Sequence, residues 1–277
     1  MKHAYYAFTG GEKNFFERQQ HAVELGCHGI EYINQLELAT PDKEYAYRLR
    51  ENADKLGLPS PCFSVYAEVM KDPAASVAEL KRYMDMGEVL GCSFFHHTYG
   101  PILDGQSKSE YLKTAVEVAK QTSAYARERG MELLIEPQGA TMNGVDMLGA
   151  YLDAMGDDAW LILDTGNIFE SGDTSLALLD ALWHKVRHVH IKDMIYYDKL
   201  PAFPDVNWRR CPNGAGARQT VVGQGEVDFA PIFAKLKKMN YDGWFALEYD
   251  APEAFDPYYS ISYANFKEMH ARAFGRK

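Results

Sequence analysis

The ten residues ELGCHGIEYI, numbers 24–33, decide the fold that we predict for this chain. They join the polar end of a helical segment to a glycine and then to a short apolar strand. The same order recurs as EVLGCSFFHH (88–97), RERGMELLIEP (127–137) and KKMNYDGWFALEY (237–249). Repeated units of this kind are typical of a parallel sheet whose strands are connected by helices.

Short apolar or β-branched runs predict eight strands, which we place at residues 4–9, 29–33, 62–66, 93–98, 132–136, 161–164, 186–191 and 244–248. Amphipathic segments such as residues 109–130 separate them. Eight such units close most naturally into a single (β/α)8 TIM barrel, which we expect to occupy residues 1–277. A doubly wound open sheet has the same local pattern, but no GxGxxG motif follows the first strand.

Composition narrows the class of protein. A chain of 277 residues with 47% hydrophobic residues is a normal size for one barrel. The net charge of −10 and the lack of a basic run argue against a nucleic-acid partner. Four cysteines without a CxxC pair suggest reduced thiols in the cytoplasm. With no apolar run of membrane-spanning length, we expect no membrane partner, and a homo-oligomer is left open.

One long loop, residues 193–228, follows the seventh predicted strand. It is rich in proline, glycine, arginine and aromatic residues, and in a barrel it lies on the face where active sites form. We select Arg218 from this loop as a substrate contact, alongside Arg209 and Arg210 as candidates for a lid or a subunit contact. The default interpretation of these residues is a solvated loop. The GQGE segment in it reads as a tight turn rather than a phosphate-binding loop.

Four consecutive predicted strands end in residues able to bind a metal: Glu136, Asp164, His190 and Glu248. A buried strand that finishes on a carboxylate places a charge where it is costly unless it is paired or bound to a metal. Neighbouring strand ends of a closed barrel converge, so three carboxylates and one imidazole predict one divalent ion. Mn²⁺ is our first choice, with Mg²⁺, Co²⁺ or Zn²⁺ as alternatives. A helix cap or a surface ion pair explains one such acid but not four in a row.

Two pairs of histidines are sorted by strand alternation. We expect His190 to point into the barrel as a ligand and His188 to lie on the opposite face in a structural role. His96 and His97 end the fourth strand, so only one of them faces inward, and we select His97 to contact a sugar hydroxyl.

The remaining candidates also stand near strand ends. Glu31 and Tyr66 end the second and third strands and could face a substrate. Lys192 shares the face of His190, where it would neutralise developing negative charge or a phosphate, unless it pairs with Asp193 or another strand-end carboxylate. Asn167 follows Asp164 by three residues and suits a hydrogen bond to a substrate hydroxyl.

The motifs IEP, LDTGN with SGD, HVHIKD, GQGEVDF and LEYD, in this order, resemble the xylose isomerase-like TIM-barrel superfamily of sugar and sugar-phosphate isomerases and epimerases. That group includes tagatose/psicose 3-epimerase-like, hydroxypyruvate isomerase-like and inosose dehydratase-like enzymes, and more distantly the endonuclease IV type of AP endonuclease. The resemblance covers essentially the whole chain. It implies metal ligands at Glu136, Asp164, His190 and Glu248, with the two glutamates also acting as acid and base.

The resemblance implies a divalent-metal-dependent isomerase or epimerase that acts on a sugar, sugar phosphate or keto-sugar through an enediolate. The metal would stabilise the developing oxyanion by several kcal/mol. An alternative is a metal-dependent lyase or dehydratase on a keto-inositol or keto-glycoside, since an enediolate can also expel a β-leaving group. A further alternative is a non-catalytic barrel that binds a metal or a carbohydrate.

Departures from the family pattern narrow these choices. The ketose 3-epimerases commonly have a histidine, an arginine and a glutamate at positions that are Asn167, Tyr196 and Met142 here. The chain therefore lacks three side chains with which those enzymes commonly bind a free ketose. The nuclease branch needs extra histidine ligands for a zinc cluster, so Asn167 and the acidic composition also argue against DNA repair.

Overall fold

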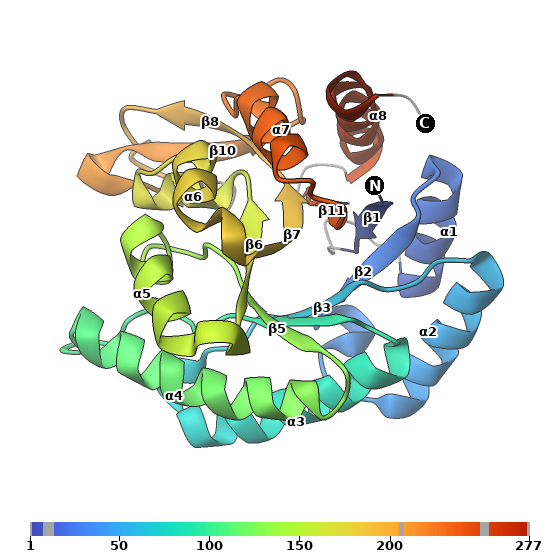
Figure 1. Cartoon of the computed structure of the whole chain (residues 1–277), viewed down its shortest axis with the longest axis horizontal. Coiled ribbons are helices and arrows are strands. Elements are labelled where there is room, and N and C mark those ends of the chain that lie inside the picture. Colours follow the sequence, from blue (N-terminus) through green and yellow to red (C-terminus); the bar gives the residue numbers. More distant parts are fainter. Residues whose placement is uncertain (1, 8–13, 205–207, 250–254, 276–277) are drawn as a thin grey trace.

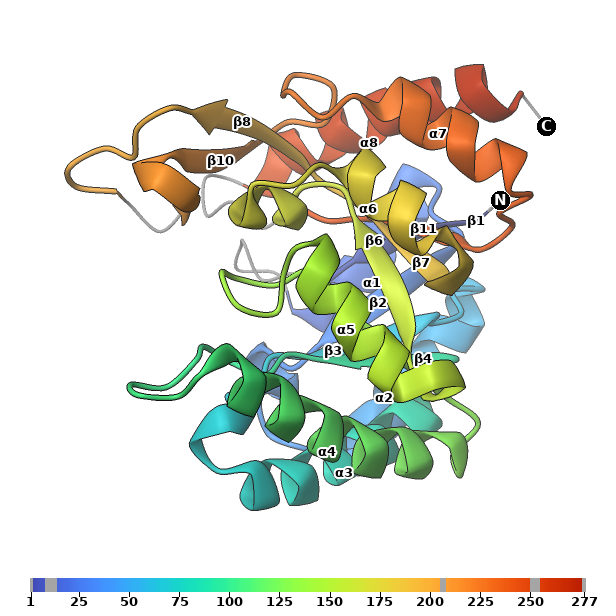
Figure 2. The same ribbon diagram turned by 60° about the vertical axis from the view of Figure 1, so that its left-hand side comes forward.

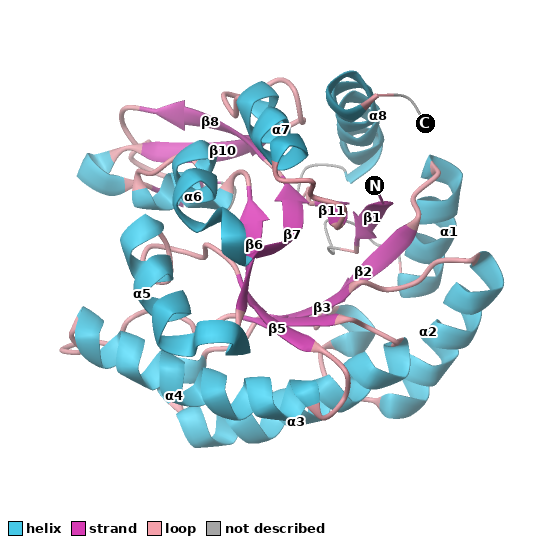
Figure 3. Cartoon of the chain, viewed as in Figure 1, coloured by secondary structure: helices cyan, strands magenta, loops and turns pink. Residues whose placement is uncertain are grey.

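The computed structural model of the chain describes residues 2–7, 14–204, 208–249 and 255–275. Within these residues eight parallel strands close into one barrel, which confirms the predicted (β/α)8 fold. Figures 1 and 3 show the helices arranged around the strands. The barrel strands are β1 (Lys2–Tyr6), β2 (Gly29–Ile33), β3 (Cys62–Val65), β4 (Phe94–His97), β5 (Glu132–Ile135), β6 (Trp160–Asp164), β7 (Val186–Ile191) and β11 (Trp244–Leu247).

The helices have clear sequence signals at their ends. The side chains and backbone amides of Ser107 and Glu110 form a capping box at the start of α4, and Asn14 and Glu17 do the same for α1. Gly26 ends α1 at a φ of 77°, a left-handed conformation that favours glycine, so the chain reverses into β2. The helices are α1 (Phe15–Leu25), α2 (Lys43–Leu56), α3 (Pro73–Leu90), α4 (Lys108–Arg127), α5 (Val145–Met155), α6 (Ser175–Leu182), α7 (Phe229–Lys238) and α8 (Phe255–Phe274).

The predicted strands agree with the observed ones to within one or two residues, except at the start of the chain. There β1 covers Lys2–Tyr6, earlier than the predicted 4–9, and positions 8 and 9 lie outside the described residues. The early start arises because Lys2 and His3 pair in register with Trp244 and Phe245 of β11. Pairing with the last strand, which sequence periodicity does not reveal, sets this end of the barrel.

The interior of the barrel is apolar at depth and polar at the carboxyl ends of its strands. Cys62, Leu134 and Ile162 form a separate buried cluster, against which Phe94 and Trp160 pack. Two residues further along the same strands stand Ser64, Glu136 and Asp164, which face the same side because strand side chains alternate. This apolar cluster therefore lies on the amino-terminal side of these three polar side chains.

The region 193–228, expected as a loop, contains an antiparallel sheet of three strands in the order β8, β10, β9. These are β8 (Asp193–Tyr197), β9 (Trp208–Arg210) and β10 (Gly216–Thr220). In Figure 2 this sheet extends outward beyond the barrel. The sequence did not reveal these short strands, and the glycines and prolines of the region lie mainly between them, where they form the turns.

Asp193 anchors the return of this region to the barrel. Its carboxylate accepts the backbone N–H groups of Gly223 (2.8 Å), Gly225 (2.9 Å) and Val227 (3.2 Å). A Cβ atom at Gly225 would lie 2.2 Å from Asp193 Oδ1, so only glycine allows this close approach. The GQGE segment is thus a tight turn, as predicted. In the described part of the chain, no helix has the length and hydropathy needed to cross a membrane.

Candidate metal centre

The four predicted ligands lie together at the carboxyl ends of β5, β6, β7 and β11. Glu136, Asp164, His190 and Glu248 are each at most 1% exposed. Each offers a nitrogen or oxygen atom, and these four atoms all lie within 4.8 Å of one another. The barrel therefore gathers, from strands spread over more than a hundred residues of sequence, three carboxylates and one imidazole.

The turn after β6 fixes the orientation of Asp164. Its Oδ1 atom accepts the backbone N–H groups of Gly166 (2.7 Å) and Asn167 (2.6 Å). Its Oδ2 atom has no hydrogen-bond partner among the described residues and lies 3.8 Å from Lys192 Nζ. Burial raises the pKa of Asp164 well above its usual range, Lys192 opposes this rise, and Glu136 adds to it. One oxygen is thus fixed by the backbone while the other is buried without a donor.

His190 contacts two of the three carboxylates of this cluster. Its Nδ1 atom lies 2.6 Å from Glu136 Oε1 and 3.2 Å from Glu248 Oε2. Burial alone would lower the pKa of His190, but Glu136 and Glu31 raise it well above its usual value. The Nδ1 side of the ring is therefore the side that faces the carboxylates.

Lys192 joins Glu248 to Asn167. Its ammonium group donates to Glu248 Oε1 at 2.7 Å and to Asn167 Oδ1 at 2.9 Å. Burial opposes ionisation of Glu248, yet Lys192 and His190 hold its pKa well below the usual range. Of the two pairings left open by the sequence, Lys192 takes a strand-end carboxylate, whereas Asp193 binds backbone amides.

The LDTGN motif positions Lys192 as well as Asp164. Thr165 Oγ1 donates to the carbonyl of Lys192 at 2.7 Å and accepts its N–H at 2.9 Å. A Cβ atom on Gly166 would lie 2.7 Å from Lys192 Cγ, so the glycine leaves room for the lysine side chain. The motif therefore couples the end of β6 to the end of β7.

The donor set fits a divalent cation. Asp164 Oδ2 and Glu248 Oε2 are buried carboxylate oxygens without a hydrogen-bond partner in the described part of the chain. Such atoms are costly unless a cation compensates them. Three carboxylates with one imidazole form a mainly oxygen site, which suits Mn²⁺ or Mg²⁺ better than a soft, thiolate-binding metal.

A cavity of about 690 Å³ opens beside this cluster. Glu248, Lys192, Asn167 and Tyr66 lie in its wall, where the sequence placed them as candidates, and its other lining residues include Thr98, Tyr99, Gln138, Met142, Glu170 and Arg209. Arg209 Nε lies 3.6 Å from Glu170 Oε1. A substrate in this cavity would thus meet Glu248 and Lys192 at one end.

The choice between His96 and His97 was wrong. His97 points away from the barrel interior, because its Nε2 atom lies 3.2 Å from Thr122 Oγ1 in α4. His96 faces inward, with Nδ1 3.2 Å from Ser64 Oγ and Nε2 4.0 Å from Glu136 Oε2. Strand alternation separates the two histidines. His96 lies two residues after Phe94, which packs against the buried cluster inside the barrel, so His96 points to the same side.

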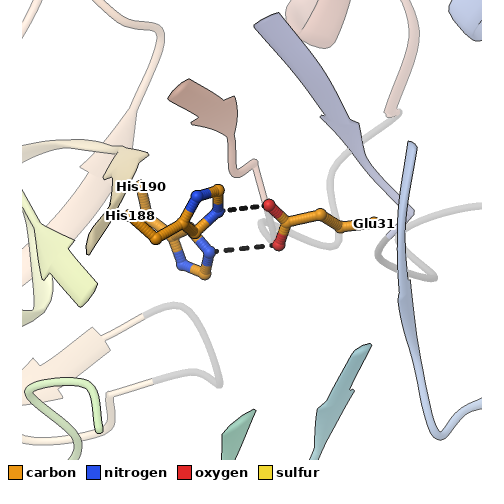
Figure 4. Close-up of side chains that lie close together, drawn as sticks. All are labelled: Glu31, His188 and His190. Carbon is orange, nitrogen blue, oxygen red and sulfur yellow. Dashed lines mark hydrogen bonds and ion pairs between the residues drawn. The ribbon is translucent and has the colours of Figure 1, made fainter. Parts of the chain in front are cut away.

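The expected separation of His188 from His190 was also wrong, because residues two apart in a strand share a face. Figure 4 shows both rings directed at the carboxylate of Glu31. Glu31 is fully buried under the cluster and is not in the described wall of the cavity, so it does not meet a substrate there. Burial alone would raise the pKa of Glu31, but His188 and His190 hold it at about 2.

Arg218 does not line the cavity in the described structure. It lies on β10 opposite Ile195 and borders a separate hollow with Tyr249 and Tyr258. Arg209, on the neighbouring strand, is the arginine in the cavity wall. The strand register of the antiparallel sheet determines which of the two arginines lines the cavity. That register was not predictable, because the sequence analysis treated the region as a loop.

Sequence analysis missed Tyr6. Its hydroxyl lies 3.3 Å from that of Tyr66, and its ring centre is 5.1 Å from that of His190. Tyr6 ends β1, but the predicted first strand covered residues 4–9 and placed Tyr6 in its interior, so the strand-end rule used for the acids did not select it.

Comparisons with known proteins agree with the observed fold. Residues 19–267 match the sequence profile of the family described as xylose isomerase-like TIM barrel. An inosose dehydratase of Clostridium perfringens is 31% identical over 159 residues, which are 53% of this chain and 51% of that protein. The chain therefore spans about half the length of the curated relatives it matches.

Two solved structures share the fold. The IolI protein, crystallised with a zinc atom, is similar with a TM-score of 0.76 and 18% identity, covering 99% of this chain and 98% of that one. The 3-keto-D-glucoside 4-epimerase of E. coli has a TM-score of 0.75 and 16% identity, covering 97% and 99%.

Proposed function

The chain belongs to the xylose isomerase-like TIM-barrel family, and on this premise we propose that it is a divalent-metal-dependent dehydratase acting on a keto-inositol or a similar keto-polyol. The sequence relatives named inosose dehydratase support this choice. The 3-keto-D-glucoside 4-epimerase of E. coli, at 16% identity, resembles the chain in fold alone. The order of our two enzymatic hypotheses is therefore reversed, and the dehydratase comes first.

The contact between Glu248 and Lys192 in the cavity wall is the observation that carries the proposal. Dehydration next to a carbonyl needs a base for the C–H proton and an acid for the leaving hydroxide. Glu248 takes the proton, and the Lys192 ammonium group gives one to the hydroxide, which leaves as water. The proton on Glu248 then passes to Lys192 across their 2.7 Å contact, so both groups return to their starting states.

The other groups of the cluster orient the substrate. A bound divalent ion, with Mn²⁺ as our first choice, would polarise the carbonyl and stabilise negative charge on its oxygen by several kcal/mol. Glu136, Asp164, His190 and Glu248 would hold that ion. Asn167, held by Lys192, presents its amide to a substrate hydroxyl.

An isomerase or epimerase is the second candidate. Glu136 favours it, because a second carboxylate in the same cluster could return a proton to the opposite face of the substrate. Two differences from the ketose 3-epimerase pattern weigh against it. Met142 lines the cavity with an apolar side chain, and Tyr196 lies partly exposed on β8 outside the described cavity wall.

Incubation of Mn²⁺-loaded protein with inosose in D₂O tests the proposal by proton NMR. The dehydratase predicts loss of water and appearance of an unsaturated or diketone product. Deuterium next to the carbonyl without loss of water would replace it with the epimerase. Failure of both reactions with inosose, 3-keto-glucosides and free ketoses would contradict both enzymatic candidates and favour the metal- or carbohydrate-binding barrel.

A further inference from the structure

The carboxylate of Glu31 lies between two imidazole rings beneath the proposed metal site, as Figure 4 shows. Its Oε1 atom contacts Nε2 of His188, and its Oε2 atom lies 3.2 Å from Nε2 of His190. All three side chains are 0% exposed. We infer that Glu31 is a positioning residue, which binds the Nε2 proton of His190 so that the Nδ1 lone pair points at the metal. The inference rests on the metal site proposed above.

The two nitrogens of His190 face different surroundings. Nδ1 points at Glu136 and Glu248, both members of the candidate metal centre, whereas Nε2 points at Glu31, which is not. A neutral imidazole that binds a metal through one nitrogen carries its proton on the other. A carboxylate on that second nitrogen fixes the tautomer and the ring orientation and strengthens the metal bond.

His188 keeps Glu31 in this orientation. Its Nε2 atom contacts Glu31, and its Nδ1 atom has no hydrogen-bond partner among the residues described. The proton of His188 therefore belongs on Nε2, where it reaches the carboxylate. The ring also packs against Phe94, with centres 6.0 Å apart, so it does not turn freely. Each oxygen of Glu31 then receives one N–H donor, which compensates the burial of its charge.

A second metal between Glu31, His188 and His190 is the competing use of the same three side chains, since their ligand atoms also lie within 4.8 Å of one another. The observed contacts favour the hydrogen-bonded arrangement, because both oxygens of Glu31 have a hydrogen-bond partner, whereas Asp164 Oδ2 and Glu248 Oε2 of the candidate metal centre have none among the described residues. A second ion would also have to share His190 with the first. Metal stoichiometry separates the two uses.

The tautomer of His190 is measured on the wild-type chain, labelled with ¹⁵N-histidine and loaded with ¹¹³Cd²⁺. We expect one Cd²⁺ per chain, cadmium–nitrogen coupling to Nδ1 of His190, and a proton on its Nε2. Coupling to Nε2, or two Cd²⁺ per chain with coupling to His188, overturns the inference. A chain that binds no Cd²⁺ refutes the metal site itself and this inference with it. Bound Cd²⁺ with the expected coupling but no dehydration by the Mn²⁺ form refutes only the dehydratase.

A pair of variants supplies the second readout. Glu31→Gln keeps the size of the side chain but presents an NH₂ group to one of the two histidines, so Mn²⁺ affinity is expected to fall about 10- to 100-fold. Asp193→Asn is the matched control, because Asp193 is equally buried but binds backbone amides rather than a histidine. It is expected to lower thermal stability while Mn²⁺ affinity stays within about twofold. Equal loss of Mn²⁺ affinity in both variants overturns the inference, and the wild-type NMR result stands if Glu31→Gln does not fold.

Discussion

The two ends of the barrel both bury ionisable side chains, but with opposite results. At the amino end, His3 and His270 lie with ring centres 4.6 Å apart, and their Nε2 atoms have no hydrogen-bond partner in the described structure. Burial lowers the pKa of His3 to about 3 and that of His270 to about 4. At the carboxyl end, burial likewise opposes the charge of Glu31 and Glu248, yet their partners hold the pKa of each carboxylate below its usual value, so both stay ionised.

The difference lies in the partners. Glu31 and Glu248 each accept a hydrogen bond from an imidazole or an ammonium group, whereas the main charged neighbours of His3 are other bases. For these groups, burial without an opposite charge favours the neutral form, and burial with a directly hydrogen-bonded opposite charge favours the ionised form. Asp164, whose Oδ2 atom lies 3.8 Å from Lys192 without a hydrogen bond, keeps a raised pKa. At the amino end, the neutral histidines therefore serve as packing residues of the fold. The arrangement at the carboxyl end keeps acids available for a cation and for proton transfer.

Glu248→Gln is expected to have the largest effect. Glutamine keeps the shape but cannot take a proton, and it removes the negative partner of Lys192. Turnover should fall by about 10³-fold or more, with weaker Mn²⁺ binding and an unchanged circular dichroism spectrum. Glu132→Gln, at the opposite end of β5, is the control and should retain activity. Full activity of Glu248→Gln would remove Glu248 from the mechanism.

Lys192→Met separates the two halves of the proposed reaction. Removal of the ammonium group should slow water loss by about 10²-fold, because the leaving hydroxide loses its proton donor. Deuterium exchange next to the carbonyl should fall much less, since Glu248 remains. Both rates are read from one NMR time course in D₂O. Equal losses in exchange and elimination would contradict the assigned role of Lys192.

The amino end predicts a stability that depends on pH. Because burial depresses the pKa values of His3 and His270 in the folded chain below the usual histidine value of 6.5, the unfolded chain takes up protons first as pH falls. The contribution of these two histidines to the free energy of unfolding is fully present above pH 6.5 and is lost progressively towards pH 4. His270→Phe should reduce that loss by about 1 kcal/mol, a value discounted for partial solvent screening.

Urea unfolding at several pH values measures this effect. His184→Phe, at an exposed position, is the control and should leave the pH dependence unchanged. An identical acid loss in wild type and His270→Phe would show that the histidines do not control it.

The smallest expected effect compares the two arginines of the outer sheet. Arg209 lines the cavity and lies near Glu170, whereas Arg218 borders a different hollow. Arg209→Ala should raise KM by about threefold to tenfold with little change in kcat, the pattern of lost uniform binding. Arg218→Ala should leave KM unchanged in steady-state assays. The reverse result would restore the original choice of Arg218.

The sequence was sufficient to predict the barrel and the four side chains that cluster in the candidate metal centre. The segments that end in Glu136, Asp164 and Glu248 predict both features. The apolar run predicts a buried strand of the barrel, and the acid that follows marks the carboxyl end of that strand, where the candidate metal ligands lie. Strand alternation, applied correctly, also separates His96 from His97 and puts His188 beside His190.

Other features depend on contacts between distant segments. The pairing of Glu31 with His188 crosses 157 positions of the chain, and the choice between Arg209 and Arg218 depends on the register of a sheet inside a region without strong periodicity. No local pattern of residue types encodes these two features.

Anomalous diffraction at the manganese edge, from crystals of the Mn²⁺-loaded chain, tests the central claim most directly. The account predicts one peak per chain, about 2.0–2.4 Å from an oxygen of Glu136, Asp164 and Glu248 and from Nδ1 of His190. A peak elsewhere, a second peak beside Glu31, or no peak at saturating Mn²⁺ would contradict it.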